Sequence, residues 1–119
     1  METKINLHFK DIVIPATLNG STAAREFLSR LPCVIHASRY EFDICGIMDR
    51  PLPRIKEELV TDWHNGDISF DGTYFTILFE HEEESASYGQ CANLGTVNCP
   101  LSQLEALRGS YDIQIEKAE

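Results

Sequence analysis

The stretch Ile68-Ser69-Phe70-Asp71-Gly72-Thr73-Tyr74-Phe75-Thr76-Ile77-Leu78-Phe79 carries the clearest structural signal in the chain. Two apolar runs flank Asp71-Gly72, a dipeptide suited to the type I′ turn of a β-hairpin. The run from 74 to 79 is almost entirely apolar, so we expect it to be covered on both faces, as in a barrel whose outside carries a helix. The sequence therefore predicts a hairpin with one fully buried strand.

A second hairpin is predicted from the N-terminal residues. Apolar and polar side chains alternate over residues 4–9, and residues 12–18 continue this half-buried strand pattern after a short turn at Lys10-Asp11. Pro15 cannot donate to a strand ladder, so we expect it at an edge or a bulge. Further short strands are predicted at residues 33–37, 41–45, 94–97 and 111–115, with a polar turn near Ser38 and Arg39 between the first two.

Two short helices are predicted between the strands. The first follows a cap at Ser21 or Thr22, repeats its apolar residues at helical spacing, and ends at Pro32. The second is expected over residues 101–107, where Ser102 and Glu105 have the spacing of a capping box.

The pattern gives about eight short strands and two helices in one domain, residues 1–119, with no repeat or linker. A chain of 119 residues that is 43% hydrophobic is sufficient for one core. Residues 54–63 remain open, because Ile55, Leu59 and Trp63 are spaced for a helix while residues 57–60 suit the start of a strand.

The charge and the N-terminus disfavour several kinds of partner. Nineteen acidic and ten basic residues give a formal net charge of -9, which repels phosphate backbones and anionic lipid headgroups. We therefore expect no nucleic-acid partner and no membrane partner. The N-terminal residues lack the apolar stretch of a signal peptide, which indicates a cytoplasmic location. The four cysteines are accordingly expected to be reduced.

Three segments, taken in order, resemble the small prokaryotic cyclophilin-like family, whose members are largely of uncharacterised function. Residues 19–28 with Leu31-Pro32 are similar to the family's capped first helix. Asn65-Gly66-Asp67-Ile68 leads into the apolar strand as in the family's Gly-Asp-Ile hairpin. Tyr88 and Leu94-Gly95-Thr96-Val97, with the helix after them, resemble the barrel-closing strand. The resemblance implies a mainly β fold, a closed cyclophilin-like β-barrel of about eight strands with two short α-helices.

The resemblance leaves the activity open, because one barrel fold hosts unrelated sites. True cyclophilins isomerise prolyl bonds with a surface arginine beside aromatic and amide side chains, and a donor near the prolyl nitrogen weakens the resonance that sets the rotation barrier. This sequence has no Phe-His-Arg stretch of that kind, and Arg39 and Arg50 lie in turns or loops. We therefore expect a non-enzymatic binder of a peptide or small metabolite. The alternatives are an isomerase with a rearranged site, or a structural or oligomeric module.

Two polar loops supply the candidate binding residues. Trp63 and Tyr88 each place an amphipathic ring beside hydrogen-bonding groups in a loop, where binding residues often lie. If the barrel closes as in the family, one barrel opening is lined by a shallow ligand-binding site consisting of Arg50, Trp63, Tyr88, Gln90 and Asn93. The competing interpretation is that Trp63 plugs the barrel end and Tyr88 covers it.

No cofactor and no metal site is predicted. The histidines lack metal-ligand spacing, and His81 with Glu82 to Glu84 is interpreted as a solvated loop. Asp67 and Asp71 are assigned to turns rather than to acid–base chemistry. Among the cysteines, Cys33 and Cys45 are expected to be buried, and Cys91, in a polar stretch, is expected to be the one nearer solvent.

Overall fold

The N-terminal alternation forms the predicted hairpin. A computed structural model describes residues 2–118, and in it β1 (Thr3–Phe9) pairs antiparallel with β2 (Ile12–Leu18). The pairing of β2 with β8 (Cys91–Val97) ends at Ala16, one residue after Pro15. The Pro15 carbonyl still accepts a hydrogen bond from the Asn98 backbone. Pro15 therefore lies within the β1–β2 ladder, opposite Asn6, but just beyond the end of the β2–β8 ladder, where its missing N–H leaves no strand partner unsatisfied.

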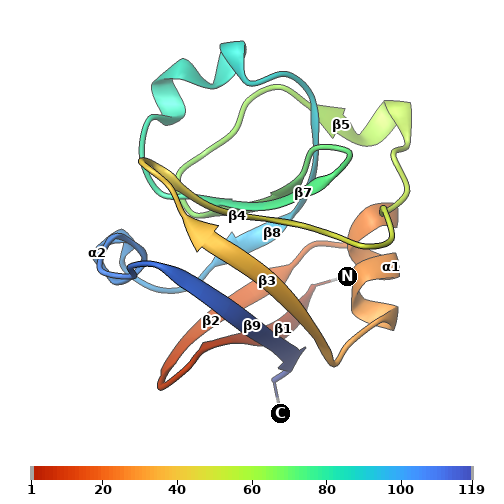
Figure 1. The fold of residues 1–119 in the computed structure, drawn as a ribbon. Coiled ribbons are helices and arrows are strands. Elements are labelled where there is room, and N and C mark those ends of the chain that lie inside the picture. Colours follow the sequence, from red (N-terminus) through yellow and green to blue (C-terminus); the bar gives the residue numbers. More distant parts are fainter. Residues whose placement is uncertain (1, 119) are drawn as a thin grey trace.

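Eight strands close into one antiparallel barrel (Figure 1), which confirms the predicted fold class. Their order around the barrel is β2-β1-β9-β3-β4-β7-β6-β8, and the pairing of β2 with β8 closes it. A ninth, two-residue strand, β5, adds to β8 outside this ring. The remaining strands are β3 (Cys33–Arg39), β4 (Asp43–Ile47), β5 (Leu59–Val60), β6 (Asp67–Phe70), β7 (Tyr74–Leu78) and β9 (Ser110–Lys117).

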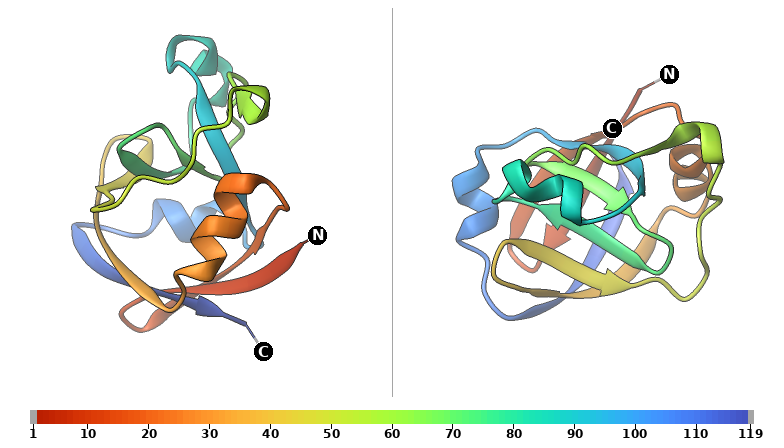
Figure 2. Two further views of the ribbon diagram at one scale, coloured as in Figure 1. Left: turned by 90° about the vertical axis from the view of Figure 1, so that its right-hand side faces the viewer. Right: turned by 90° about the horizontal axis from the view of Figure 1, so that it is seen from above.

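Two helices lie on opposite sides of the barrel, α1 (Thr22–Ser29) and α2 (Leu101–Glu105) (Figures 1 and 2). Phe27 of α1 and Leu104 of α2 are fully buried in the same core as the inward-facing strand residues. The Ser21 side chain caps α1 by accepting a hydrogen bond from the Ala24 backbone at 3.2 Å, as predicted. The capping box predicted for α2 is wrong, since the residue before this helix is Pro100 and no side chain caps it.

The hairpin predicted at residues 68–79 is present as β6 and β7, but its turn differs from the prediction. A type I′ turn needs two successive positive φ angles, and only Gly72, at 112°, has one here. The Asp71 carboxylate accepts a hydrogen bond from the Tyr74 backbone at 3.0 Å, which stabilises the turn by another route. The assignment of Asp71 to a turn is thereby confirmed.

Both faces of β7 are covered, as predicted, but no helix covers the outer one. Phe75 and Ile77 point into the barrel core, while Leu78 points outward. Leu78 packs with Trp63 and Cys91 in a second, smaller cluster on the outer wall of the barrel, which we call the outer cluster. Loops that fold back over β7 and β8 therefore cover the outer face of β7 in place of the expected helix.

The open segment at residues 54–63 adopts irregular structure with a 3₁₀ turn, η1 (Lys56–Glu58), followed by β5. The Glu58 carboxylate accepts hydrogen bonds from the Thr22 backbone at 2.9 Å and from its hydroxyl at 3.1 Å. At the other end of the segment, Trp63 is buried in the outer cluster. Both ends are therefore held by contacts distant in sequence.

The chain between β3 and β4 turns at residues 40–42, later than the predicted Ser38 and Arg39. Those two residues instead extend the ladder by pairing with Cys45 and Ile44. A second 3₁₀ segment, η2 (Glu82–Ser87), precedes β8. Within residues 2–118, none of the helices has the length and apolar character needed to cross a bilayer.

Candidate functional site

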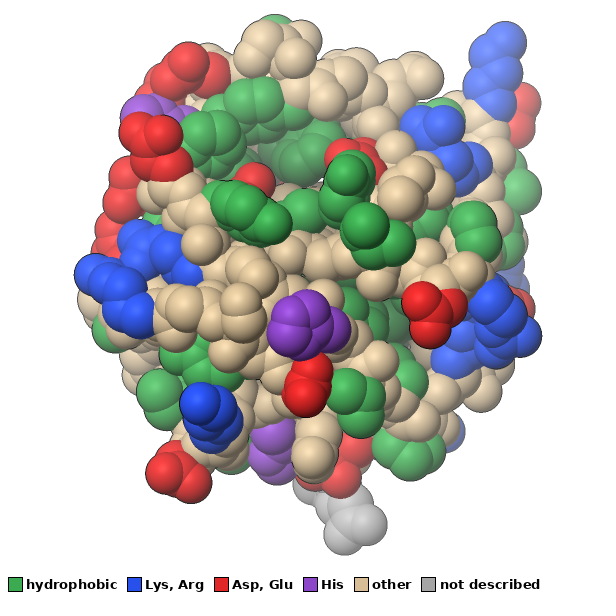
Figure 3. Space-filling model, viewed as in Figure 1, with side chains coloured by type: hydrophobic (Ala, Val, Ile, Leu, Met, Phe, Trp, Pro, Cys, Tyr) green, Lys and Arg blue, Asp and Glu red, His purple; other side chains and the backbone are tan. Residues whose placement is uncertain are grey.

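A hollow lies on the outer wall of the barrel, between strands β4 and β7 and the loops above them. Figure 3 shows this face, where hydrophobic side chains surround most of the hollow and acidic side chains lie at its margin. Its volume is about 210 Å³. The lining residues come from β4, β7 and four loops, and they are Phe42, Asp43, Cys45, Trp63, Asp71, Thr76, Leu78 and Tyr88.

The floor of the hollow follows from strand alternation. Ile44 of β4 points into the barrel core, so its neighbours Asp43 and Cys45 face outward. In β7 the same alternation turns Thr76 outward, where it is only 4% exposed. The Thr76 hydroxyl donates to the Cys45 sulfur at 3.5 Å. Polar side chains therefore stand on a surface that the overlying loops shield from water.

Three aromatic rings form the wall. Tyr88 stacks on Phe42 with ring centroids 5.9 Å apart, and meets Trp63 edge-on at 5.4 Å. The Trp63 indole N–H donates to the Gly89 carbonyl at 3.0 Å, and the Tyr88 hydroxyl donates to the His81 carbonyl at 2.7 Å. Because the polar tips of Trp63 and Tyr88 are already hydrogen-bonded, the wall offers mainly its apolar ring surface.

Two carboxylates share the hollow. Burial raises the pKa of the Asp43 carboxyl above its ordinary value, and the neighbouring charge of Asp71 raises it further. Among residues 2–118, Asp43 has no hydrogen-bond or ion-pair partner for its carboxylate. Asp71 by contrast accepts from the turn backbone. The hollow therefore contains one half-buried acid whose charge the protein does not compensate.

A shallower depression of about 350 Å³ continues from the hollow across β4, and Cys45 borders both. Its rim carries three large apolar side chains that solvent reaches: Tyr40 is 57% exposed, Ile47 59% and Tyr74 42%. The two depressions together form a track along the outer face of β4.

The five predicted site residues do not gather in one place. Trp63 and Tyr88 are in contact in the wall of the hollow. Asn93 lines a different groove, where the Asn19 side chain donates to its side-chain oxygen at 2.9 Å. Arg50 is exposed near the end of α1, and its carbonyl accepts from Arg30. Gln90 is exposed at the start of β8.

The groove that contains Asn93 is wider, about 690 Å³, and polar. Its side chains largely satisfy one another, since Asn19 bonds Asn93, Asn98 bonds Thr17 at 2.8 Å, and His64 lies 3.6 Å from Asp62. Burial raises the pKa of Asp67 at its margin, although this carboxylate accepts from the His64 backbone at 2.9 Å. Asp67 therefore stabilises a turn, as predicted.

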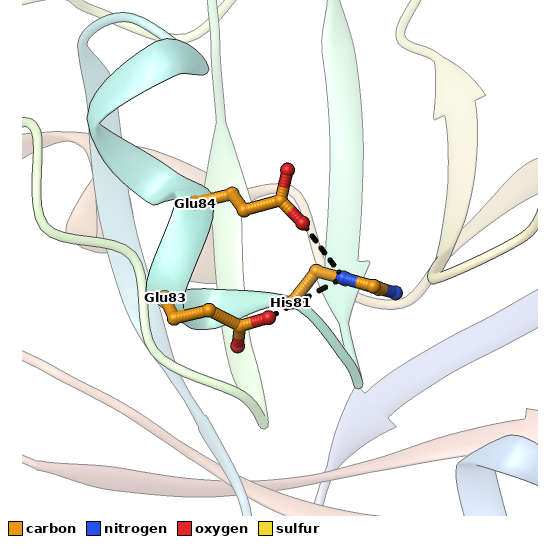
Figure 4. A group of neighbouring side chains, drawn as sticks. All are labelled: His81, Glu83 and Glu84. Atoms are coloured by element: carbon orange, nitrogen blue, oxygen red, sulfur yellow. Dashed lines mark hydrogen bonds and ion pairs between the residues drawn. The ribbon is translucent and has the colours of Figure 1, made fainter.

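His81, Glu83 and Glu84 form a compact group on η2 (Figure 4), with ligand atoms all within 4.8 Å of one another. His81 Nδ1 lies 2.9 Å from Glu84 and 3.4 Å from Glu83. The hydrogen bond to Glu84 raises the pKa of the His81 imidazole, with further help from the neighbouring carboxylates. Both glutamates are exposed, and an ion-pair network at a loop surface accounts for the geometry.

The cysteine expected nearest solvent is in fact the most buried. Cys91 is 0% exposed beneath Trp63, whereas Cys33, Cys45 and Cys99 are half-buried. Burial raises the pKa of the Cys91 thiol to about 11. The polar residues before Cys91 misled the prediction, because β8 begins at Cys91 and turns its side chain under the indole.

The site residues that the sequence did not reveal are Phe42, Asp43 and Asp71, which join Trp63 and Tyr88. A weak signal existed for Asp43, since the alternation of Asp43-Ile44-Cys45 puts this acid on the face opposite the buried isoleucine. Nothing local shows that loops from residues 63 and 88 fold over that face.

Comparison with known families agrees with the architecture. The model of the cyclophilin-like family matches residues 7–116, so the chain belongs to the cyclophilin-like family. Searches of curated proteins and of solved structures gave no match.

Proposed function

We propose that this cyclophilin-like protein is a ligand-binding domain that takes a short peptide or small metabolite in the hollow beside β4. The observation that carries the proposal is the combination of an aromatic wall with the uncompensated Asp43 carboxylate. The barrel interior offers no such site, because fully buried side chains such as Phe9, Phe70 and Phe75 fill it. Binding therefore takes place on the wall of the barrel rather than through an open end.

The hollow is preferred over the wider polar groove for a physical reason. Ligand sites combine apolar surface with a few polar groups that await a partner. The groove has little aromatic surface, and its amides already bond one another. The hollow has three rings and one unpaired acid within a small, shielded volume.

The sole tryptophan of the chain provides a direct test, because Trp63 lies in the wall of the hollow. We expect its fluorescence to change saturably on titration with a panel of N-acetyl amino-acid methylamides that vary in side-chain charge and size. Tyr88→Ala should weaken the response at least several-fold, and Ile12→Ala on the distant β1–β2 hairpin should leave it unchanged. A panel that leaves the emission and the amide NMR spectrum unchanged would overturn the proposal.

Isomerase activity is the rival function, and the contacts of Arg39 and Arg54 bear on it. Arg39 is engaged, since its guanidinium donates to the carbonyls of Glu105 and Leu107 and stacks over Phe79 at 4.8 Å. Arg54 lies beside Gly72 in the turn next to the hollow, so it is the arginine that a rearranged isomerase site would use.

Cis–trans exchange in Xaa-Pro peptides, followed by NMR, separates the two functions. Uncatalysed exchange takes roughly tens to hundreds of seconds, so weak catalysis is visible. We expect no acceleration by the protein. Acceleration that disappears in Arg54→Ala, but persists in Arg25→Ala on the exposed side of α1, would replace binding by isomerisation as the function.

We also propose that the protein is cytoplasmic and has no nucleic-acid or membrane partner. Four unpaired cysteines suit a reducing compartment. The formal charge of -9 supports a partner that is neutral or cationic rather than a polyanion.

A further inference from the structure

We infer that the hollow is selective for a cation, an ammonium or guanidinium group of the kind that ends a lysine or arginine side chain. This inference rests on the proposed function, and it names the chemical class of the ligand. The ligand places its charged end between the Asp43 carboxylate and the aromatic wall.

The first argument is electrostatic. Asp43 stands half-buried on the floor of the hollow, and among residues 2–118 it has no hydrogen-bond or ion-pair partner. Asp71 lines the same hollow and adds a second negative charge. A half-buried carboxylate that lacks a partner destabilises the protein, and an incoming cation offsets that cost with a charge-assisted hydrogen bond.

The second argument comes from the wall. Phe42, Trp63 and Tyr88 line the same hollow as the two acids, and the negative faces of aromatic rings attract cations that sit within about 6 Å of a ring centre. An anionic ligand would meet repulsion from the rings and from both carboxylates. A neutral apolar ligand would gain the ring contacts but would bury Asp43 further without compensation.

The protein does not fill this place with a cation of its own. The charged neighbour that acts on Asp43 is the acid Asp71, and Asp43, Glu83 and Glu84 all act on neutral Tyr88. The His81 ring packs against Phe42 and pairs with Glu84. Arg39 is held by carbonyls near the end of α2. Arg54 lies at the neighbouring turn beside Gly72 and is not among the lining residues.

The size of the hollow limits what enters it. A volume of 210 Å³ equals that of roughly seven water molecules at about 30 Å³ each, enough for a charged end group with part of its methylene stem. The rest of a peptide would lie along the track on β4, where Tyr40 and Tyr74 are exposed. The geometry thus suits a lysine or arginine side chain that enters from an extended peptide.

Three probes separate charge from shape: the N-acetyl methylamides of lysine, norleucine and glutamate. Norleucine keeps the methylene stem of lysine and lacks its charge. We expect the lysine probe to bind at least about tenfold more tightly than the norleucine probe, as one charge-assisted contact provides, and the glutamate probe to bind most weakly. Trp63 fluorescence and amide NMR shifts report each titration.

Asp43→Asn should remove the preference for lysine over norleucine, whereas Asp49→Asn, at an exposed position outside the hollow, should retain it. Equal binding of lysine and norleucine in the hollow would overturn the cation inference and leave the proposed function standing. No response to any probe would overturn both. If Asp43→Asn does not fold, the salt dependence of binding to the wild type tests the inference instead. The affinity for the lysine probe must then fall with ionic strength while the affinity for the norleucine probe does not. A salt-independent affinity for the lysine probe overturns the inference.

Discussion

Asp43 occupies an unusual environment for an ionisable side chain. It lies outward from β4, yet loops cover it, and both burial and Asp71 disfavour its charged form. Evolution toward stability alone would favour a neutral residue at this position, because an unpaired half-buried acid costs free energy. In the proposed function, the bound cation offsets this cost.

The first prediction concerns the pH dependence of stability. The pKa of Asp43 is raised above the ordinary 3.8, so the native state holds this proton more tightly than the unfolded state. The ionised carboxylate therefore lowers the free energy of unfolding above the raised pKa, and the effect vanishes below pH 3.8. Without ligand, Asp43→Asn should melt a few degrees higher than the wild type at pH 7, with no difference near pH 3.

Thermal unfolding of both proteins across this pH range tests the prediction. Burial also raises the pKa of Asp67, so the difference between the two curves is the informative quantity. A variant less stable than the wild type at pH 7 would show that the Asp43 carboxylate has a stabilising partner.

Cys91 should react more slowly with thiol reagents than the other three cysteines. Its thiol is 0% exposed and its pKa is raised to about 11. At neutral pH a reagent therefore cannot reach the sulfur, and the thiol is not ionised to the reactive thiolate. We expect iodoacetamide at pH 8 to modify half-buried Cys33, Cys45 and Cys99 before Cys91, by at least roughly tenfold in rate. Mass spectrometry of the peptides measures this order, and early modification of Cys91 would mean that the indole above it opens readily.

Single residues also mark the limit of prediction from sequence. The chemistry of Trp63 and Tyr88 makes them candidates from sequence alone, and the structure brings the two rings into contact. Asn93 follows Tyr88 closely in sequence but lines another groove, because β8 carries the chain away from η2. Gln90 is exposed just before β8 begins. Whether the predicted set binds a ligand stays a prediction, while the hollow adds residues that only the fold assembles.

Elements whose signal is local were predicted well. The hairpins at residues 3–18 and 67–78 follow from alternation and turn residues, and α1 follows from its cap and apolar spacing. Residues 54–63 have no such signal. Glu58 bonds Thr22, which lies 36 residues away, and Trp63 packs under a loop 25 residues further on, so this segment takes its shape from the rest of the molecule.

Two hydrogen bonds from Thr22 to Glu58 tether η1 to α1, and we expect this tether to stabilise the fold. Glu58 accepts from both the backbone and the hydroxyl of Thr22, at the first turn of α1. Glu58→Ala should lower the free energy of unfolding by about 1–2 kcal/mol, the usual cost of losing such a cap. Glu57→Ala, at an exposed neighbour, should have an effect below about 0.5 kcal/mol.

Urea unfolding measures both changes. Glu58→Gln keeps one acceptor oxygen and should recover part of the loss. Equal effects of Glu57→Ala and Glu58→Ala would mean that the two hydrogen bonds from Thr22 to Glu58 add nothing to stability.

At the scale of the whole molecule, two apolar layers share one sheet. The inner layer fills the barrel and includes residues from both helices, whereas the outer cluster holds only Trp63, Leu78 and Cys91 at full burial. The closed sheet encloses the inner layer. The hollow is built by the outer one, which explains why the sequence predicted the barrel more completely than the site.

Because the outer cluster is small and its largest side chain, Trp63, comes from a loop, it should open without unfolding the barrel. Trp63→Ala removes its largest side chain, at a cost of about 3 kcal/mol. We expect hydrogen exchange at the Tyr88 amide, which bonds Ser85 at 3.0 Å in η2, to accelerate strongly, and exchange in β1 and β9 to change little. Phe9→Ala, in the barrel core, should accelerate exchange in both layers. Uniform acceleration in Trp63→Ala would instead make the two layers one cooperative unit, with the hollow as stable as the barrel beneath it.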